Sequence, residues 1–367
     1  MLKVGMVGVG CISAIYLKNF AEVFKDVELI AVCDLIRERA EKAQKDYNIP
    51  KLYDTMEELF ADPEIDIVLN LTRPYQHYAV SKGALLAGKH VYSEKPLGAD
   101  WEEGTELVRL AQERGLWIGG APDTFMGAGY QSCRKYIDEG LIGDIIGGRC
   151  VLSSSGVETW HPDPDFYYQR GGGPLLDMGP YYITALINLL GGVKSVYGTS
   201  HTTYSERLIT AKPHEGEIIK VNVPTHYECI MNFDCGVSIS YVTSFDTLNP
   251  NMQHMLIYGT KGNLTCPDPN RFGADKGMLF QSAETGETTE LPLVFDYAHN
   301  SRCLGLADLA AAIEKGRPPR TSYLQTYHVL EVMMGIMKSA ETGLPYEMTT
   351  HFEREAPMDP TLPHGVL

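Results

Sequence analysis

Apolar residues follow two alternating patterns along the first 120 residues. Short apolar runs have the length of buried strands, and the segments between them carry apolar residues at helical spacing. The predicted strands are residues 3–9, 27–33, 51–53, 65–71 and 116–119, with a further short strand just before Glu94, and the predicted helices are residues 14–24, 37–47, 55–61 and 100–114. Such alternation predicts an α/β domain with a doubly wound parallel sheet over residues 1–120.

The pattern changes after residue 120. Residues 145–153, 195–203, 225–233, 237–244, 254–258 and 262–266 are strand-like runs, several of them joined by turn residues. Neighbouring hairpins predict an α+β domain over residues 121–300 with a large, mostly antiparallel open sheet. Helical spacing recurs at 130–139, in the segment that ends at Leu190, and at 300–315 and 323–342, and the Pro-rich residues 351–367 are expected to form a tail.

The turn after the first strand reads Gly8-Val9-Gly10-Cys11-Ile12-Ser13. Gly8 allows a tight turn, and Gly10 lets a pyrophosphate approach the backbone at the helix N-terminus. Ser13 replaces the third glycine of the dinucleotide fingerprint and is small enough to keep helix and strand close. We therefore expect a Rossmann domain in which Gly8, Gly10, Cys11 and Ile12 bind the cofactor.

Asp34 follows the second strand, roughly 20 residues beyond the glycine turn, where a carboxylate accepts hydrogen bonds from the ribose hydroxyls of NAD. The same charge repels a 2′-phosphate, so the position favours NAD over NADP. Arg37 and Arg39 follow closely. They are either solvated helix charges or contacts to adenine and phosphate, which keeps NADP as an alternative.

Two further turns lie where strands end. Thr72-Arg73-Pro74-Tyr75-Gln76-His77 follows the strand at 65–71, and Glu94-Lys95-Pro96 follows the next one. Open parallel sheets bind ligands at this carboxyl edge, so Lys95 is either an active-site ammonium or a solvated loop lysine. His77 is either a core histidine or a cofactor contact.

Together the glycine turn, Asp34, the Pro74-x-x-His77 turn and the segment from Ala87 to Pro96 resemble the glucose–fructose oxidoreductase, inositol dehydrogenase and rhizopine-catabolism family. The resemblance spans most of the chain. It implies that Lys95 lies beside the nicotinamide and the substrate hydroxyl, and that the Lys95–Pro96 peptide bond is cis. It also implies that Thr72, Pro74, His77 and Glu94 belong to the cofactor side, and that residues of about 300–345 pack back on the nucleotide domain.

The family usually carries Asp-x-Gly-x-His on a helix that faces the substrate. Asp177 matches the aspartate, whereas Tyr181 stands where the histidine is expected. Three groups therefore remain candidates for the proton carrier: Lys95 with a lowered pKa, the phenol of Tyr181, and His161 from the aromatic loop around residues 160–168. His161 is slightly preferred, because an imidazole suits proton transfer near neutral pH.

Composition narrows the function classes. The 367 residues are 44% hydrophobic and 21% charged, with a formal net charge of −16, which argues against binding nucleic acid or an anionic membrane. The eight cysteines form no Cys-x-x-Cys pair and are typical of buried thiols in a reducing compartment. Without an apolar leader or a membrane-spanning run, we expect a cytoplasmic protein. No metal site is predicted.

These observations predict an NAD-dependent dehydrogenase that moves hydride between nicotinamide and a secondary hydroxyl of a sugar, glycoside or cyclitol. The resemblance implies the substrate class and a homodimer or homotetramer formed through the C-terminal sheet. Two alternatives remain. One is a glycosidase that oxidises C3 transiently with bound NAD. The other is a non-catalytic nucleotide-sensing regulator, against which the intact Lys95 and Asp177 count.

Overall fold

The computed structural model describes residues 1–248 and 254–367. Its contacts divide the chain into two compact units. Unit 1 comprises Met1–Met126, His299–Tyr327 and Met358–Leu367, and unit 2 comprises Gly127–Ala298 and His328–Pro357. The boundary between Tyr327 and His328 falls inside helix α9 (Tyr323–Thr342), whose uninterrupted helical spacing gives no sign of it.

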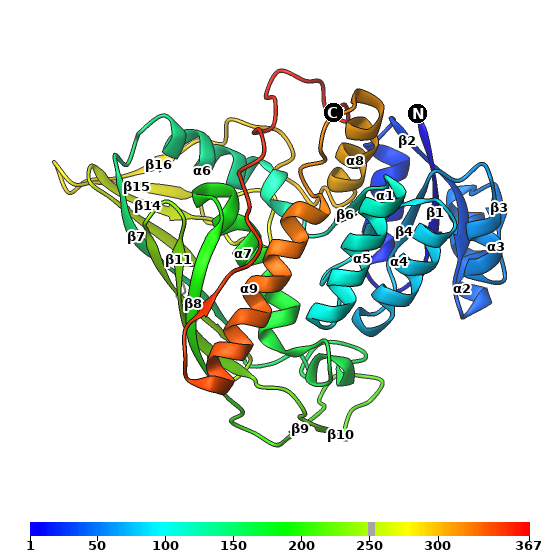
Figure 1. Ribbon diagram of the computed structural model, residues 1–367, viewed down its shortest axis with the longest axis horizontal. Coiled ribbons are helices and arrows are strands. Elements are labelled where there is room, and N and C mark those ends of the chain that lie inside the picture. The colour runs from blue at the N-terminus through cyan, green and yellow to red at the C-terminus, as the bar shows by residue number, and fades with distance from the viewer. Residues whose placement is uncertain (249–253) are drawn as a thin grey trace. The chain divides into compact units, whose positions relative to one another are not determined.

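Unit 1 is built on a six-stranded parallel sheet (Figure 1). In spatial order its strands are β3 (Lys51–Leu52), β2 (Val27–Cys33), β1 (Leu2–Val7), β4 (Ile67–Asn70), β5 (His90–Ser93) and β6 (Ile118–Gly120). Its helices are α1 (Ser13–Glu22), α2 (Arg37–Tyr47), α3 (Met56–Ala61), α4 (His77–Leu86), α5 (Trp101–Arg114) and α8 (Leu304–Lys315). This confirms the predicted doubly wound α/β domain.

The order of the strands explains where unit 1 can bind a ligand. β1 and β4 are neighbours, and from them the chain builds outward in opposite directions. Both strands are buried on both faces, so they read as continuous apolar runs in the sequence. Their carboxyl ends form a topological switch point, the usual ligand site of an open α/β sheet.

Unit 2 is built on a nine-stranded sheet (Figure 1). In spatial order its strands are β16 (Thr288–Leu291), β15 (Met278–Ser282), β14 (Gly262–Cys266), β13 (Met255–Gly259), β7 (Ile145–Ser153), β12 (Ser238–Ser244), β11 (His226–Phe233), β8 (Val193–His201) and β17 (Tyr346–Glu347). β7 and β12 are parallel and the other pairs are antiparallel, which confirms the predicted sheet. Helix α7 (Gly173–Leu190) packs against β11 and β12, and α6 (Ala128–Asp138) packs against α7 and β14.

Five strands of unit 2 were not predicted: β15, β16, β17 and the two strands of a small hairpin. β9 (Glu206–Leu208) and β10 (Ile218–Lys220) form an antiparallel hairpin whose strands are too short to show a period of two. The hairpin shares a small separate core with the segment that follows β7. That core consists of Val157, Tyr168, Ile209, Ala211, Ile219 and Phe245.

The C-terminal residues pack on the chain itself. Met358 and Leu367 are buried, and Lys315 donates a hydrogen bond of 2.5 Å from Nζ to the carbonyl of Leu367. The expected tail is therefore divided, with residues up to Pro357 in unit 2 and those from Met358 in unit 1. Across residues 1–248 and 254–367, no helix has the length and apolar character needed to cross a bilayer.

Candidate active site

The glycine turn has the geometry that its sequence requires. Gly8 has φ of +98°, and a Cβ atom there would lie 2.8 Å from the carbonyl carbon of Leu71, so no other residue fits without strain. No atom of the described residues lies within 4 Å of a Cβ added at Gly10, which leaves its backbone open to a ligand. Ser13 closes the turn by donating from Oγ to the carbonyl of Gly10 at 2.7 Å. The cradle thus fits a pyrophosphate at the N-terminus of α1.

Asp34 lies at the end of β2 and is held by two backbone donors. Oδ2 accepts from the N–H of Val9 at 2.6 Å, and Oδ1 accepts from the N–H of Ile36 at 2.8 Å. The carboxylate therefore joins the glycine turn to the start of α2. Each oxygen keeps a further acceptor site, which suits the hydroxyls of a ribose.

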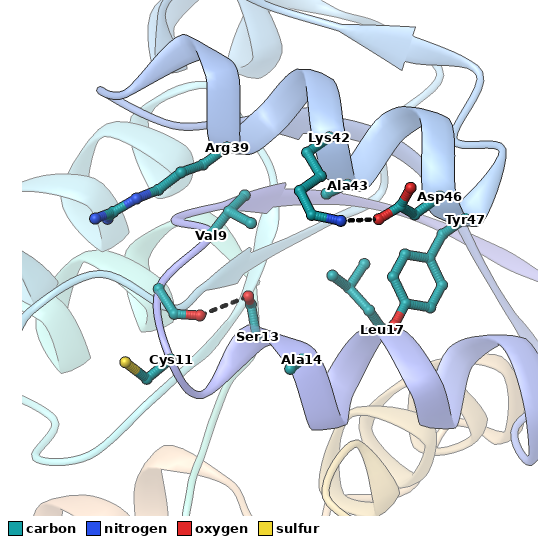
Figure 2. A pocket seen from close by; sticks show the side chains of 11 residues that line it. Val9, Cys11, Ser13, Ala14, Leu17, Arg39, Lys42, Ala43, Asp46 and Tyr47 are labelled. Atoms are coloured by element: carbon teal, nitrogen blue, oxygen red, sulfur yellow. Dashed lines mark hydrogen bonds and ion pairs between the residues drawn. The ribbon is translucent and has the colours of Figure 1, made fainter. Parts of the chain in front are cut away.

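The two arginines of α2 differ in their surroundings. Arg37 forms ion pairs with Glu41, 2.7 Å from Nε to Oε1, and with Asp54. Arg39 instead lines a cavity of about 420 Å³ bounded by the glycine turn, α1 and α2. Figure 2 shows its side chain projecting from α2 on the side of the glycine turn, while Lys42 points toward Asp46. Arg39 is therefore the better placed of the two to meet a nucleotide.

Two loops at the same sheet edge are joined by polar side chains. Asn70 is buried at the end of β4, and its Oδ1 accepts from Oγ1 of Thr72 at 2.6 Å. The ring of His77 lies between the carbonyls of Pro96, 2.9 Å from Nδ1, and Thr72, 3.0 Å from Nε2. Burial lowers the pKa of His77, although both carbonyls oppose this. His77 thus links the two loops, with Pro74 opening a 3₁₀ turn between them at Pro74–Gln76.

Lys95 follows β5, and its peptide bond to Pro96 is cis, as the resemblance implies. The neighbouring Glu94 is buried, and its Oε1 accepts from the hydroxyl of Tyr16 at 2.8 Å. Its Oε2 accepts from the backbone N–H of Lys95 at 3.2 Å. Tyr16 belongs to α1 and was not predicted, because in the sequence it is one more apolar position of a helix.

Asp123 is a further buried acid of unit 1, also missed by the sequence analysis. Its Oδ2 accepts from the N–H of Gly305 at 3.0 Å, near the start of α8. Burial raises the pKa of Asp123 to about 6, although the N–H of Gly305 and the charge of Arg302 oppose this rise. A group with this pKa changes charge close to neutral pH.

The other three predicted catalytic residues belong to unit 2. Helix α7 has already begun at Asp177, so Asp177 and Tyr181, four positions apart, share one face. Tyr181 is buried and Asp177 is half-buried.

His161 lies in the loop between β7 and α7. Its Nδ1 accepts from the backbone N–H of Asp163 at 3.0 Å, and its ring packs edge-on against Phe166 and Tyr167. Because a backbone N–H occupies Nδ1, the neutral imidazole carries its proton on Nε2. In neutral His161 the Nε2 atom is therefore a donor and not an acceptor.

A buried arginine fastens the segment that carries His161. Arg207, on β9, donates to Glu158 at 2.9 Å from Nη1 to Oε1 and also binds the carboxylate of Asp246. The hydroxyl of Tyr168 donates to the same Glu158. These residues come from separate stretches of sequence, so no local pattern could have joined them. No group of three His, Cys, Asp or Glu side chains in the described parts of the chain is arranged to hold a metal ion.

Two family models match the sequence. Residues 2–119 match an oxidoreductase family with an NAD-binding Rossmann fold, and residues 130–265 match the GFO/IDH/MocA C-terminal domain. The fold and the glycine turn are thus those of an oxidoreductase family with an NAD-binding Rossmann fold. The chain belongs to the glucose–fructose oxidoreductase, inositol dehydrogenase and rhizopine-catabolism (Gfo/Idh/MocA) family, which confirms the resemblance seen in the sequence.

Named relatives are diol and sugar dehydrogenases. The trans-1,2-dihydrobenzene-1,2-diol dehydrogenase of Macaca fuscata fuscata is 33% identical over 216 residues, which are 57% of this chain and 63% of that protein. The D-xylose dehydrogenase of Paenarthrobacter nicotinovorans is 30% identical over 172 residues, 46% of this chain and 43% of that protein. Both matches span less than two thirds of the relative.

A solved structure shares the fold over almost the whole chain. It is a levoglucosan dehydrogenase in complex with NADH and L-sorbose, with a TM-score of 0.80 at 19% identity over 95% of this chain and 99% of that one. At this identity the likeness concerns the fold alone.

Proposed function

We propose that the protein is an NAD-dependent dehydrogenase that oxidises a secondary hydroxyl of a sugar, glycoside or cyclitol, or reduces the matching ketone. The observation that carries the proposal is Lys95 at the carboxyl end of β5, with its backbone N–H held by the buried Glu94. The diol and sugar substrates in the names of the relatives support the substrate class.

The residues divide into cofactor and substrate roles. Gly8, Gly10 and Asp34 hold NAD, which when bound supplies the hydride acceptor. Lys95 donates a hydrogen bond to the carbinol oxygen and favours its deprotonation. Asp177 binds a substrate hydroxyl from α7.

We propose a proton acceptor other than the one that the sequence slightly favoured. The sequence slightly favoured His161, but its Nδ1 already accepts the N–H of Asp163, so a neutral ring has no lone pair left at Nε2. We assign His161 the donation of a hydrogen bond to the substrate. Tyr181 is the proton acceptor, and a cation beside it would stabilise its phenolate.

Tyr181→Phe is therefore expected to lower kcat by roughly 100-fold, the usual scale for an acid–base group, with little change in KM. His161→Ala should raise the substrate KM more than it lowers kcat, because only a binding contact is lost. Steady-state kinetics across pH 6–10 separates the two effects. Equal, mild losses from both substitutions would leave Lys95 as the sole acid–base group.

NAD is proposed as the preferred cofactor because Asp34 repels a 2′-phosphate. Asp34→Ala should narrow the difference in affinity between NAD and NADP, measured by calorimetry. In the Asp34→Ala background, Arg39→Ala should lower the affinity for NADP. The matched control Arg37→Ala should leave that affinity unchanged, since Arg37 is paired with Glu41 and Asp54. A wild-type protein that prefers NADP would contradict the assignment.

The direct test of the function is an assay of sugars, cyclitols, glycosides and cyclic diols with NAD and NADP, followed by the absorbance of NADH. Reduction of NAD by at least one polyol supports the proposal. Cleavage of a glycoside without net NADH would instead indicate the glycosidase. Binding of NAD without turnover of any compound in this assay would indicate the non-catalytic nucleotide-sensing regulator.

We also propose a homodimer or homotetramer formed through the sheet of unit 2. Ile146, Tyr197 and Ile230 are exposed, and Tyr197 and Ile230 are paired on neighbouring strands. Large apolar side chains on one sheet face are typical of a subunit contact.

Six of the eight free cysteines are buried, in accord with the reducing, cytoplasmic compartment expected.

A further inference from the structure

Tyr16 reaches from the cofactor-binding helix to the residue before Lys95. It lies on α1, one turn after Ser13 of the glycine turn, and is fully buried. Its hydroxyl donates to Oε1 of Glu94 at 2.8 Å, while Oε2 of the same carboxylate accepts from the N–H of Lys95 at 3.2 Å. One carboxylate thus connects α1 to the backbone of the predicted catalytic lysine.

This hydrogen bond persists across the pH range of an assay. Burial raises the pKa of Tyr16 well above its usual value, and the negative charge of Glu94 adds to the rise. The phenol therefore keeps its proton and stays a donor. Glu94 is itself only 7% exposed, so water is a poor substitute for this donor.

The surroundings make the position of Glu94 sensitive to Tyr16. Tyr92 and Asp123 lie close enough to raise the pKa of Tyr16 further, and both are buried. The carboxylate of Asp123 accepts a hydrogen bond from the N–H of Gly305. The hydroxyl of Tyr92 has no hydrogen-bond partner among the described residues. Among Tyr16, Tyr92 and Asp123, Tyr16 is the residue that donates a hydrogen bond to Glu94.

We propose that Tyr16 is a positioning residue that fixes the backbone of Lys95 through the carboxylate of Glu94. The inference rests on the proposed function, because it concerns the lysine assigned to the substrate oxygen. Tyr16 touches neither substrate nor cofactor in this role. Without its hydroxyl, the Glu94 carboxylate is free to turn, and the hydrogen bond that holds Lys95 is weakened.

The first test compares two tyrosine substitutions. Tyr16→Phe is expected to lower kcat by about 10-fold or more, while the Kd for NAD measured by calorimetry stays within about threefold. The matched control is Tyr53→Phe, which removes a hydrogen bond of 2.9 Å to Asp62, another tyrosine–carboxylate pair of unit 1. Tyr53→Phe should leave kcat unchanged. Equal effects of the two variants would overturn the proposal.

A second readout does not depend on turnover. Labelling of Lys95 with an amine-reactive reagent, followed by mass spectrometry as a function of pH, reports the environment of its ammonium group. The labelling rate of Lys95 should change by at least about threefold in Tyr16→Phe, while that of Lys82, which is paired with Glu106, stays constant. Unchanged labelling of Lys95, or equal changes at both lysines, would overturn the proposal. A wild-type protein inactive on every substrate would refute the proposed function and leave this readout intact.

A double variant keeps the proposal testable if Tyr16→Phe alone misfolds. It also tests whether Tyr16 acts on Lys95 through Glu94. Replacing both partners of a buried hydrogen bond by apolar groups is often nearly neutral, so Tyr16→Phe with Glu94→Leu should fold even if Tyr16→Phe does not. Labelling of Lys95 should then be the same in Glu94→Leu with and without Tyr16→Phe. A further change caused by Tyr16→Phe in that background would show that it acts by another route and would overturn the proposal.

Discussion

Lys95→Ala is expected to lower turnover by roughly 100-fold or more while the affinity for NAD changes little. The lysine is the last residue before the cis proline at the carboxyl end of β5, and its backbone is held by Glu94. Its side chain is assigned to the substrate oxygen, whereas the glycine turn and Asp34 carry the cofactor. Steady-state kinetics for kcat and calorimetry for the Kd of NAD measure the two quantities separately.

Lys95→Arg is the informative companion variant. It keeps a positive charge but holds its proton at every pH used, since arginine is not deprotonated in proteins. If Lys95 serves only as a cation, the arginine variant should recover much of the activity lost in Lys95→Ala. If it exchanges a proton, both variants should be similarly slow. Near-normal turnover in Lys95→Ala would show that the lysine merely lines the site.

The sequence predicted the long elements well because their flanks are distinct. β2 and α2 were expected at the bounds observed, 27–33 and 37–47, since Asp26 and Asp34 flank the apolar run of β2, and Asn48 follows α2 in the left-handed conformation. β9, β10 and β17 have two or three residues each, too few for any period. Their positions are set by pairing with strands distant in sequence, as β17 shows by joining β8.

Candidate site residues were predictable where backbone geometry dictates the residue type. Gly8 is required by its positive φ and by the approach of Leu71, so its role can be read from the turn alone. Tyr16, Asn70 and Asp123 have no such local signature. Tyr16 acquires its role only when α1 lies against the end of β5, and Asp123 only when Gly305, far along the chain, approaches it. Neither contact can be inferred from the periodicity of the sequence.

Arg207→Met is expected to destabilise unit 2 by about 3–5 kcal/mol, because it leaves two buried carboxylates without their cation. The side chains of Arg207, Glu158 and Asp246 are 7%, 8% and 4% exposed. Neither acid can recover its lost interaction from water. Thermal and urea unfolding, followed by circular dichroism, would measure the loss.

The matched control is Arg354→Met in the same unit. Arg354 is 33% exposed and binds Asp138 at 2.8 Å, so its loss should cost about 1 kcal/mol or less. Adding Glu158→Gln and Asp246→Asn to Arg207→Met should restore part of the stability, since no unpaired buried charge then remains. Because the backbone N–H of His161 is bonded to Val157 next to Glu158, a loosened segment should also raise the substrate KM. Equal losses for Arg207→Met and Arg354→Met would contradict the assignment of Arg207 as the buried fastening of this segment.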